Sequence, residues 1–183
     1  MKRVLFFGDS LTAGYGLSDV NEAFPALIQQ RIFAEKLQYE VINAGLSGDT
    51  SGGGLARLSY WLNNPVDVFV LELGINDALR GIAPATTQKN LQAIINRVKD
   101  KYPNAKMAMM GMELPAFIPG QHVAAFRSIF KQVADANNMA FVPFFLEGVA
   151  GQRHLNLRDG LHPSAAGYRI IAEKVWPVLR AIL

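Results

Sequence analysis

Four short polar motifs hold the residues that could do chemistry. In chain order they are Gly8-Asp9-Ser10-Leu11, Ser47-Gly48-Asp49-Thr50, Gly74-Ile75-Asn76-Asp77 and Asp159-Gly160-Leu161-His162-Pro163. A serine hydroxyl becomes a good nucleophile when a neighbouring base takes its proton, and histidine suits that task near neutral pH. The pattern therefore predicts acyl transfer, with Ser10 as nucleophile, His162 as base and Asp159 orienting the imidazole.

Acyl transfer also needs hydrogen-bond donors for the oxyanion that develops on the substrate. A side-chain amide and the backbone amides of glycine-rich turns or helix starts are suitable donors. We therefore expect an oxyanion hole made of Asn76, Gly48 and the amide of Ser10. Gly45 lies in the same region of the chain, but the Ser-Gly-Asp-Thr context favours Gly48.

Structural interpretations compete with the catalytic one. Serine and asparagine often cap helices, so Ser10 and Asn76 are also candidates for that role. Asp159 is also a candidate turn residue, in which case another group would orient His162. The joint occurrence of four motifs in order favours catalysis.

The remaining ionisable residues near these motifs are interpreted as structural. Asp9, Asp49 and Asp77 are expected to bind backbone amides in turns. Glu72, inside an apolar run, needs a buried partner that the sequence does not identify. The other two histidines, His122 and His154, are expected at exposed positions.

No metal or cofactor is expected. The chain has no cysteine and three histidines, of which one lies in a carboxylate-rich motif. The triple glycine 52–54 lacks the lysine and spacing of a phosphate-binding loop, and is interpreted as the start of a helix.

The elements that must position these residues alternate between strand and helix. Five mostly apolar runs predict strands at 4–7, 39–42, 66–73, 106–112 and 140–145. Helix-like spacing of apolar residues predicts helices around 24–32, 91–98 and 126–133. A further helix is expected to start at Ser51 or after the glycines 52–54 and to run through Trp61, and a closing helix is expected over 164–183, with a possible kink at Pro177. Runs that are apolar without alternation are typical of strands covered on both faces.

This alternation predicts an α/β fold, a three-layer α/β/α sandwich with a five-stranded, mostly parallel sheet. We expect the strand order 2-1-3-4-5, which places Ser10 and Asn76 side by side where the strand order reverses.

The four motifs together resemble those of the SGNH/GDSL hydrolases, over nearly the whole chain. The chain is most similar to the small bacterial acyl-esterase, thioesterase and lysophospholipase branch of arylesterase-like enzymes. The resemblance implies a flavodoxin-like fold without metal or cofactor, and the roles already given to Ser10, Gly48, Asn76, Asp159 and His162. It also implies that acyl chains bind between the loops at 78–84 and 114–120, where the candidate substrate-binding residues are Leu79, Ile82, Pro115 and Phe117.

Composition excludes several other classes of protein. With 183 residues, 50% of them hydrophobic and 18% charged, the chain is expected to form a single domain over 1–183 rather than a disordered segment. The net charge of +3 comes from interleaved basic and acidic residues, so no nucleic-acid partner is expected. No apolar run is long enough for a membrane span. We expect a monomer.

The sequence does not fix the compartment. The apolar stretch at 4–7 is too short for a signal peptide. The resemblance nevertheless suggests the mature form of a periplasmic or secreted enzyme.

The sequence therefore predicts a serine esterase that acts through an acyl-Ser10 intermediate on short to medium acyl or aryl esters, with acyl thioesters or lysophospholipids as further candidates. Two alternatives remain open. One is a carbohydrate O-acetyl esterase, which would prefer acetylated xylan. The other is a noncatalytic ligand-binding α/β module, whose serine would not react with a fluorophosphonate.

Overall fold

The computed structural model describes residues 1–114 and 123–183. Its centre is a parallel sheet with the strand order β2-β1-β3-β4-β5. The strands are β1 (Lys2–Gly8), β2 (Tyr39–Gly45), β3 (Val68–Glu72), β4 (Lys106–Met110) and β5 (Ala140–Val142). The predicted fold class and strand order are confirmed. Residues Pro115 and Phe117, the segment 115–120 of the predicted acyl-binding loop, and His122 lie outside the described residues.

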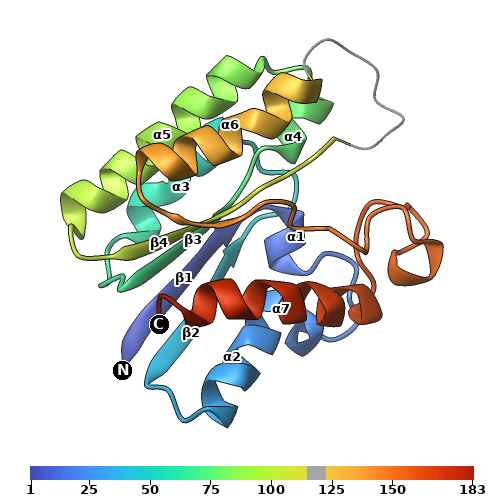
Figure 1. The fold of residues 1–183 in the computed structure, drawn as a ribbon, viewed down its shortest axis with the longest axis horizontal. Helices are drawn as coiled ribbons and strands as arrows, with labels where there is room; N and C mark the ends of the chain where they lie inside the picture. The colour runs from blue at the N-terminus through green and yellow to red at the C-terminus, as the bar shows by residue number, and fades with distance from the viewer. Residues whose placement is uncertain (115–122) are drawn as a thin grey trace.

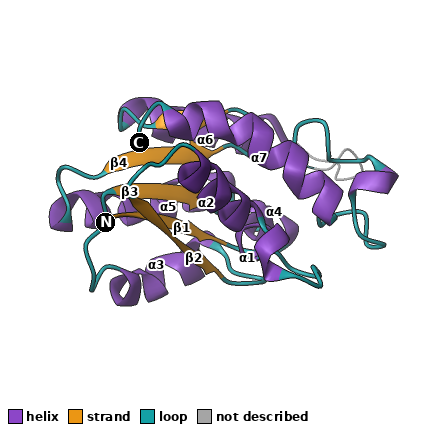
Figure 2. Ribbon diagram, turned by 90° about the horizontal axis from the view of Figure 1, so that it is seen from below, coloured by secondary structure: helices purple, strands orange, loops and turns teal. Residues whose placement is uncertain are grey.

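Helices cover both faces of the sheet. On one face lie α3 (Ser51–Trp61), α5 (Pro84–Lys101) and α6 (Val123–Ala136), and on the other lie α2 (Phe24–Ala34) and α7 (Ala165–Arg180) (Figures 1 and 2). All five residues of β3 and five of the seven in β1 are buried, because both strands lie inside the sheet and under helices. This packing explains their continuous apolar runs.

Short helices complete the chain. These are α1 (Ser10–Ala13), α4 (Ile75–Leu79) and the 3-10 turns η1 (Val20–Glu22) and η2 (Arg153–Leu155). Helix α1 directly follows β1, and α4 follows β3 after two residues. Both therefore begin at the carboxyl edge of the sheet. No helix in the described part of the chain is both long and apolar enough to cross a membrane.

All five predicted strands shift at one or both ends, and two of these differences, in β5 and β2, have physical reasons. Strand β5 ends at Val142 instead of continuing to Phe145, because Pro143 has no N–H to donate to the neighbouring strand. Strand β2 continues to Gly45, which pairs with Gly8. A side chain at Gly45 would collide with the Ala13 backbone, since an added Cβ would lie 2.2 Å from its nitrogen. Helix α7 runs through Pro177.

The strand order determines where the polar motifs meet. From β1 the chain passes to β2 on one side and then crosses to β3 on the other, so the order reverses between β1 and β3. Their carboxyl ends, Gly8 and Glu72, are paired in the sheet. A crevice for a ligand is expected at this position, and Ser10 and Asn76 both lie there.

Candidate active site

Ser10 is the first residue of α1, and the carboxylate of Asp9 caps that helix. The Leu11 amide donates to Asp9 Oδ1 over 2.9 Å. Only 7% of the surface of Ser10 is exposed. Gly8 permits this tight turn, because an added Cβ would lie 2.0 Å from Thr12 Oγ1 and 2.6 Å from the Glu72 carbonyl oxygen. The backbone therefore directs the serine toward the carboxyl edge of the sheet.

His162 brings its ring to Ser10 from the loop before α7. The distance from His162 Nε2 to Ser10 Oγ is 2.9 Å, and that from His162 Nδ1 to Asp159 Oδ2 is 2.6 Å. The three predicted residues thus form a continuous hydrogen-bonded row. A base at this distance can accept the hydroxyl proton.

Asp159 is held as an anion by its own turn. Partial burial acts to raise the pKa of Asp159, but hydrogen bonds from the Leu161 amide and from the ring and amide of His162 outweigh it. The pKa therefore lies below its ordinary value. The other carboxylate oxygen, Oδ1, accepts from the Leu161 and His162 amides over 2.9 and 3.1 Å. An ionised carboxylate beside Nδ1 keeps Nε2 free to act as a base.

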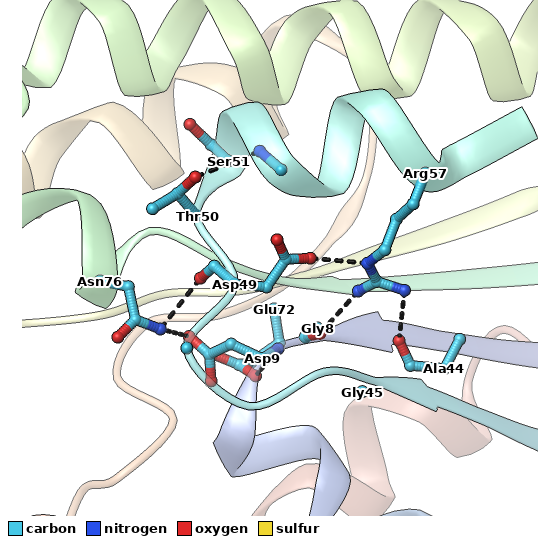
Figure 3. Close-up of polar contacts among 12 residues, drawn as sticks. Gly8, Asp9, Ala44, Gly45, Asp49, Thr50, Ser51, Arg57, Glu72 and Asn76 are labelled. Atoms are coloured by element: carbon cyan, nitrogen blue, oxygen red, sulfur yellow. Dashed lines mark hydrogen bonds and ion pairs between the residues drawn. The ribbon is translucent and has the colours of Figure 1, made fainter.

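Asn76, the second residue of α4, lies against the turns that carry Ser10 and Gly48. Its Nδ2 donates to Asp9 Oδ2 over 3.1 Å and to the Asp49 carbonyl oxygen over 2.9 Å (Figure 3). Gly48 has a left-handed backbone, with φ of 79°, and its carbonyl oxygen accepts from Arg80. The structure therefore brings the predicted oxyanion residues to one edge of the sheet, with the amide hydrogens of Asn76 already engaged.

Arg57 holds the ends of β1 and β2 together beneath these turns. Its guanidinium donates to Asp49 Oδ2 over 2.6 Å and to the carbonyl oxygens of Ala44 and Gly8 over 2.9 Å each (Figure 3). It also lies 4.1 Å from the centre of the Phe7 ring. Asp49 is thus bound by a guanidinium and not, as predicted, by a backbone amide.

The other two carboxylates that follow the motifs behave as structural residues. Asp77 accepts from the Ser51 amide over 2.8 Å and from the hydroxyls of Ser51 and Thr87, so it ties α4 to the starts of α3 and α5. Asp9 caps α1. Glu72, whose partner the sequence does not identify, accepts from the Thr12 hydroxyl over 2.7 Å and from the Asp9 amide over 3.3 Å.

A cavity of about 420 Å³ opens beside Ser10, His162 and Asn76. Its walls are mainly apolar and come from the segments after β1, β3, β4 and β5. The apolar members with large side chains are Leu11, Ile75, Leu79, Met112, Leu114, Phe144, Leu146 and Leu161. Such a lining suits an acyl chain.

The predicted substrate-binding residues fare differently. Leu79 lines the cavity and is 47% exposed. Ile82 is not among the described residues of the lining. Sequence reasoning missed Phe144 and Leu146, which follow β5, because it looked for acyl contacts only after the third and fourth strands. The rule that ligands gather at the carboxyl ends of strands would have included them.

Tyr15 is a further residue that sequence reasoning missed. Its ring packs on the His162 ring, with the ring centres 4.6 Å apart. His154 lies in η2 and is exposed, as expected. Within residues 1–114 and 123–183, no group of three or more histidine, aspartate and glutamate side chains could hold a metal ion.

A parallel sheet between helices, with serine, histidine and aspartate hydrogen-bonded in series at its carboxyl edge, is the arrangement of a serine hydrolase. The chain belongs to the GDSL-like Lipase/Acylhydrolase family, whose sequence model matches residues 6–170. This confirms the resemblance stated from the motifs. The prediction of a carboxylic ester hydrolase is likewise confirmed, because the relatives are esterases.

Two similar proteins and one similar crystal structure illustrate the relationship. The chain is 41% identical over 181 residues to Esterase TesA of Pseudomonas aeruginosa strain PAO1, which covers 98% of this chain and 89% of that protein. It is 37% identical over 171 residues to Thioesterase 1/protease 1/lysophospholipase L1 of Escherichia coli strain K12, covering 93% and 79%. A crystal structure of TesA matches with a TM-score of 0.94 and 40% identity, covering all of both chains.

Proposed function

We propose that this chain is a serine esterase that hydrolyses short to medium acyl or aryl esters through an acyl-Ser10 intermediate. The observation that carries the proposal is the row from Asp159 through His162 to Ser10, with separations of 2.6 and 2.9 Å, at the wall of an apolar cavity. Two adjacent hydrogen bonds of this kind activate a serine hydroxyl in acyl transfer.

The first half of the reaction forms the acyl-enzyme. Nε2 of His162 takes the hydroxyl proton as Ser10 Oγ attacks the ester carbonyl carbon. The tetrahedral intermediate then collapses, the bond to the alcohol oxygen breaks, and the imidazolium gives its proton to the departing alcohol. Asp159 stabilises the positive charge that His162 carries between these two transfers.

The second half releases the acid. His162 takes a proton from water, and the resulting hydroxide attacks the acyl carbon. The bond to Ser10 Oγ breaks, and the serine recovers its proton from the imidazolium. The same residues therefore act in reverse roles, and no cofactor enters either half of this scheme.

Oxyanion stabilisation is assigned to Asn76, Gly48 and Ser10. The Ser10 amide is the first of α1, and a helix leaves its first amides without an internal partner. Asn76 must redirect one amide hydrogen from Asp9 or from Asp49 toward the substrate, or share it between both acceptors. Asn76→Ala is expected to lower kcat about 10²- to 10³-fold.

The acyl group is assigned to the apolar cavity, where Leu79 and Leu161 are partly exposed. An apolar lining favours an apolar acyl chain over a polar glycan as the occupant of this cavity. The alcohol part of the ester, which leaves, would then lie outside the cavity, toward solvent. A thioester of the same acyl group would use the same residues, because His162 protonates a departing thiolate as it does an alkoxide.

The test compares wild-type protein with Ser10→Ala on p-nitrophenyl esters from acetate to palmitate, with one acyl thioester included. Wild-type protein should hydrolyse the shorter members, and Ser10→Ala should lower kcat about 10⁶-fold. Ser128→Ala, at a half-buried position on α6 away from the cavity, is the matched control and should retain full activity.

Other outcomes would replace the proposal. A strong preference for acetylated xylan would favour a carbohydrate O-acetyl esterase. If no ester is hydrolysed and a fluorophosphonate does not label Ser10, a noncatalytic binding module would be favoured. A folded Ser10→Ala protein with near-native turnover would refute the mechanism.

A further inference from the structure

Two buried carboxyl groups lie directly beneath the proposed nucleophile, and the reaction scheme uses neither. Glu72 ends β3 and is 1% exposed, and Asp9 follows β1 and is fully buried. The Asp9 amide donates to Glu72 Oε2 over 3.3 Å, so the two residues are direct neighbours. Within the described part of the chain, neither of them forms an ion pair.

Among the described residues, the charged and titratable groups around this pair offer no compensating cation. The Arg57 guanidinium binds Asp49 and two carbonyl oxygens instead. Asp49 adds negative charge, which acts to raise the pKa of Asp9. Tyr168 of α7 donates its hydroxyl to the Leu11 carbonyl oxygen, and burial holds its pKa above the ordinary value, so it stays neutral.

Two adjacent buried carboxyl groups without a cation cannot both be ionised, because each charge would lose its hydration and repel the other. Burial, the largest cause, raises the pKa of Asp9 to about 7 and that of Glu72 well above its ordinary value. The negative charge of Asp9 raises the pKa of Glu72 further. Both Asp9 oxygens accept hydrogen bonds, from the Leu11 amide and from Asn76, whereas Glu72 Oε1 is buried without a donor among the described residues. The geometry therefore favours the proton on Glu72.

The contacts of the pair converge on the residues that hold Ser10 and Asn76. Glu72 Oε2 accepts from the Asp9 amide and from the Thr12 hydroxyl, so it binds the chain both before and after Ser10. The Asp9 carboxylate accepts from Leu11 at the start of α1 and from the Asn76 side chain. In the part of the chain that the structure describes, no donor reaches the buried Glu72 Oε1, as expected if that oxygen bears the proton.

We propose that Glu72 is a positioning residue for Ser10 and Asn76 that works as an uncharged carboxylic acid and donates its proton to the Asp9 carboxylate. The role in catalysis rests on the proposed function of Ser10. The negative charge then stays on Asp9, where it caps α1 and orients the Asn76 amide. Glu72 itself touches no substrate.

Two substitutions separate the neutral-acid role from a need for charge. Glu72→Gln supplies a carbonyl oxygen for Thr12 and an N–H for Asp9, so kcat at about pH 8 should stay within about threefold of wild type. Glu72→Leu removes both contacts and should lower kcat about 10- to 100-fold with little change in KM, because small displacements of reacting groups have effects of this size. Glu40→Gln, on the exposed end of β2, is the matched control.

The proton itself is read by infrared spectroscopy at about pH 8. The difference spectrum of wild type minus Glu72→Gln should contain the carbonyl band of a protonated carboxylic acid, shifted in deuterated water. The control Glu40→Gln should show no such band. The same band should appear in a Ser10→Ala background, so the measurement does not depend on activity.

Three results would overturn the proposal. They are the absence of the protonated band, a folded Glu72→Gln protein that loses more than about tenfold in kcat, and a Glu72→Leu protein with full kcat. If Glu72→Leu does not fold, the infrared band and the kcat of Glu72→Gln still test the proposal. Failure of Ser10→Ala to lose activity would instead refute the proposed function, and leaves the band unaffected.

Discussion

Ser10 and His162 lie 2.9 Å apart, yet the regions that hold them differ in burial and in the range of their contacts. Around Ser10, Asp9 and Glu72 are at most 1% exposed, and hydrogen bonds join residues more than 60 positions apart, such as Asn76 and Asp9. Around His162, the Asp159 side chain is 39% exposed, and it lies three residues away in the same turn.

This difference separates two kinds of dependence. The buried network around Ser10 exists only when β1, β2, β3 and α3 are assembled, so its polar contacts contribute to folding as well as to catalysis. The turn that carries His162 and Asp159 closes on itself, in the loop before α7. Changes in the exposed turn should therefore affect activity more than stability, and changes in the buried network should affect both.

The largest effect is expected from His162→Ala. Without a base for Ser10, kcat should fall about 10⁶-fold. The free energy of unfolding should fall by about 1 kcal/mol at most, because the His162 side chain is partly exposed, at 21%, and loses two hydrogen bonds and one ring contact. Steady-state hydrolysis of a p-nitrophenyl ester and urea unfolding measure the two quantities. His154→Ala is the matched control, and a large loss of stability in His162→Ala would break the comparison.

The opposite behaviour is expected from Arg57→Met. The substitution leaves Asp49, which is 7% exposed, without its cation and frees the carbonyl oxygens at the ends of β1 and β2. Breaking such a pair should lower the free energy of unfolding by about 3 kcal/mol. Arg97→Met, which removes a single exposed bond to Leu55, should have little effect. Equal unfolding curves for the two variants would contradict a structural role of Arg57.

A pH dependence of stability should come from the buried side. Burial raises the pKa of Asp9 to about 7 in the folded protein, while the unfolded chain returns to about 4. Between these values the folded state binds more protons, so the free energy of unfolding should fall as pH rises from about 4 to about 7. The lowered pKa of Asp159 acts in the opposite sense, and only below about pH 4.

Asp9→Asn should make this slope shallower, because it removes one of the two buried groups that bind a proton in the folded state, while Glu72, whose pKa is also raised, still contributes. Asp159→Asn should leave the slope unchanged above about pH 4. Urea unfolding at several pH values measures both. A slope in Asp9→Asn as steep as in wild type would assign the pH dependence to other groups.

The same division limits what the sequence could predict. The strand order and the row of Ser10, His162 and Asp159 follow from motifs whose residues are close to strand ends or to one another. The partner of Glu72 could not be predicted, because Thr12 is 60 positions away and carries no motif of its own. Arg57 likewise acts on carbonyl groups of two strands, which only the assembled sheet brings together.

The smallest effect is expected from substitutions of Tyr15, which contacts both regions. Its amide donates to the Ser10 carbonyl oxygen over 3.0 Å, and its ring packs on His162 at a tilt of 46°. An aromatic ring near a cation lowers its energy by about 0.5 to 2 kcal/mol. The ring should therefore stabilise the imidazolium that forms in the transition state.

Tyr15→Ala should lower kcat about 3- to 30-fold, and Tyr15→Phe should keep most of the activity because the ring remains. Tyr60→Ala, an exposed tyrosine on α3, is the control for loss of a surface ring. Phenylalanines with increasing fluorination at position 15 test the electrostatic cause, since fluorine withdraws electron density from the ring face while packing is nearly kept. A graded fall in kcat would show that the nucleophile's turn also supports the base electrostatically. A kcat that is independent of fluorination would reduce Tyr15 to a packing contact and leave the two regions joined only at the bond between Ser10 and His162.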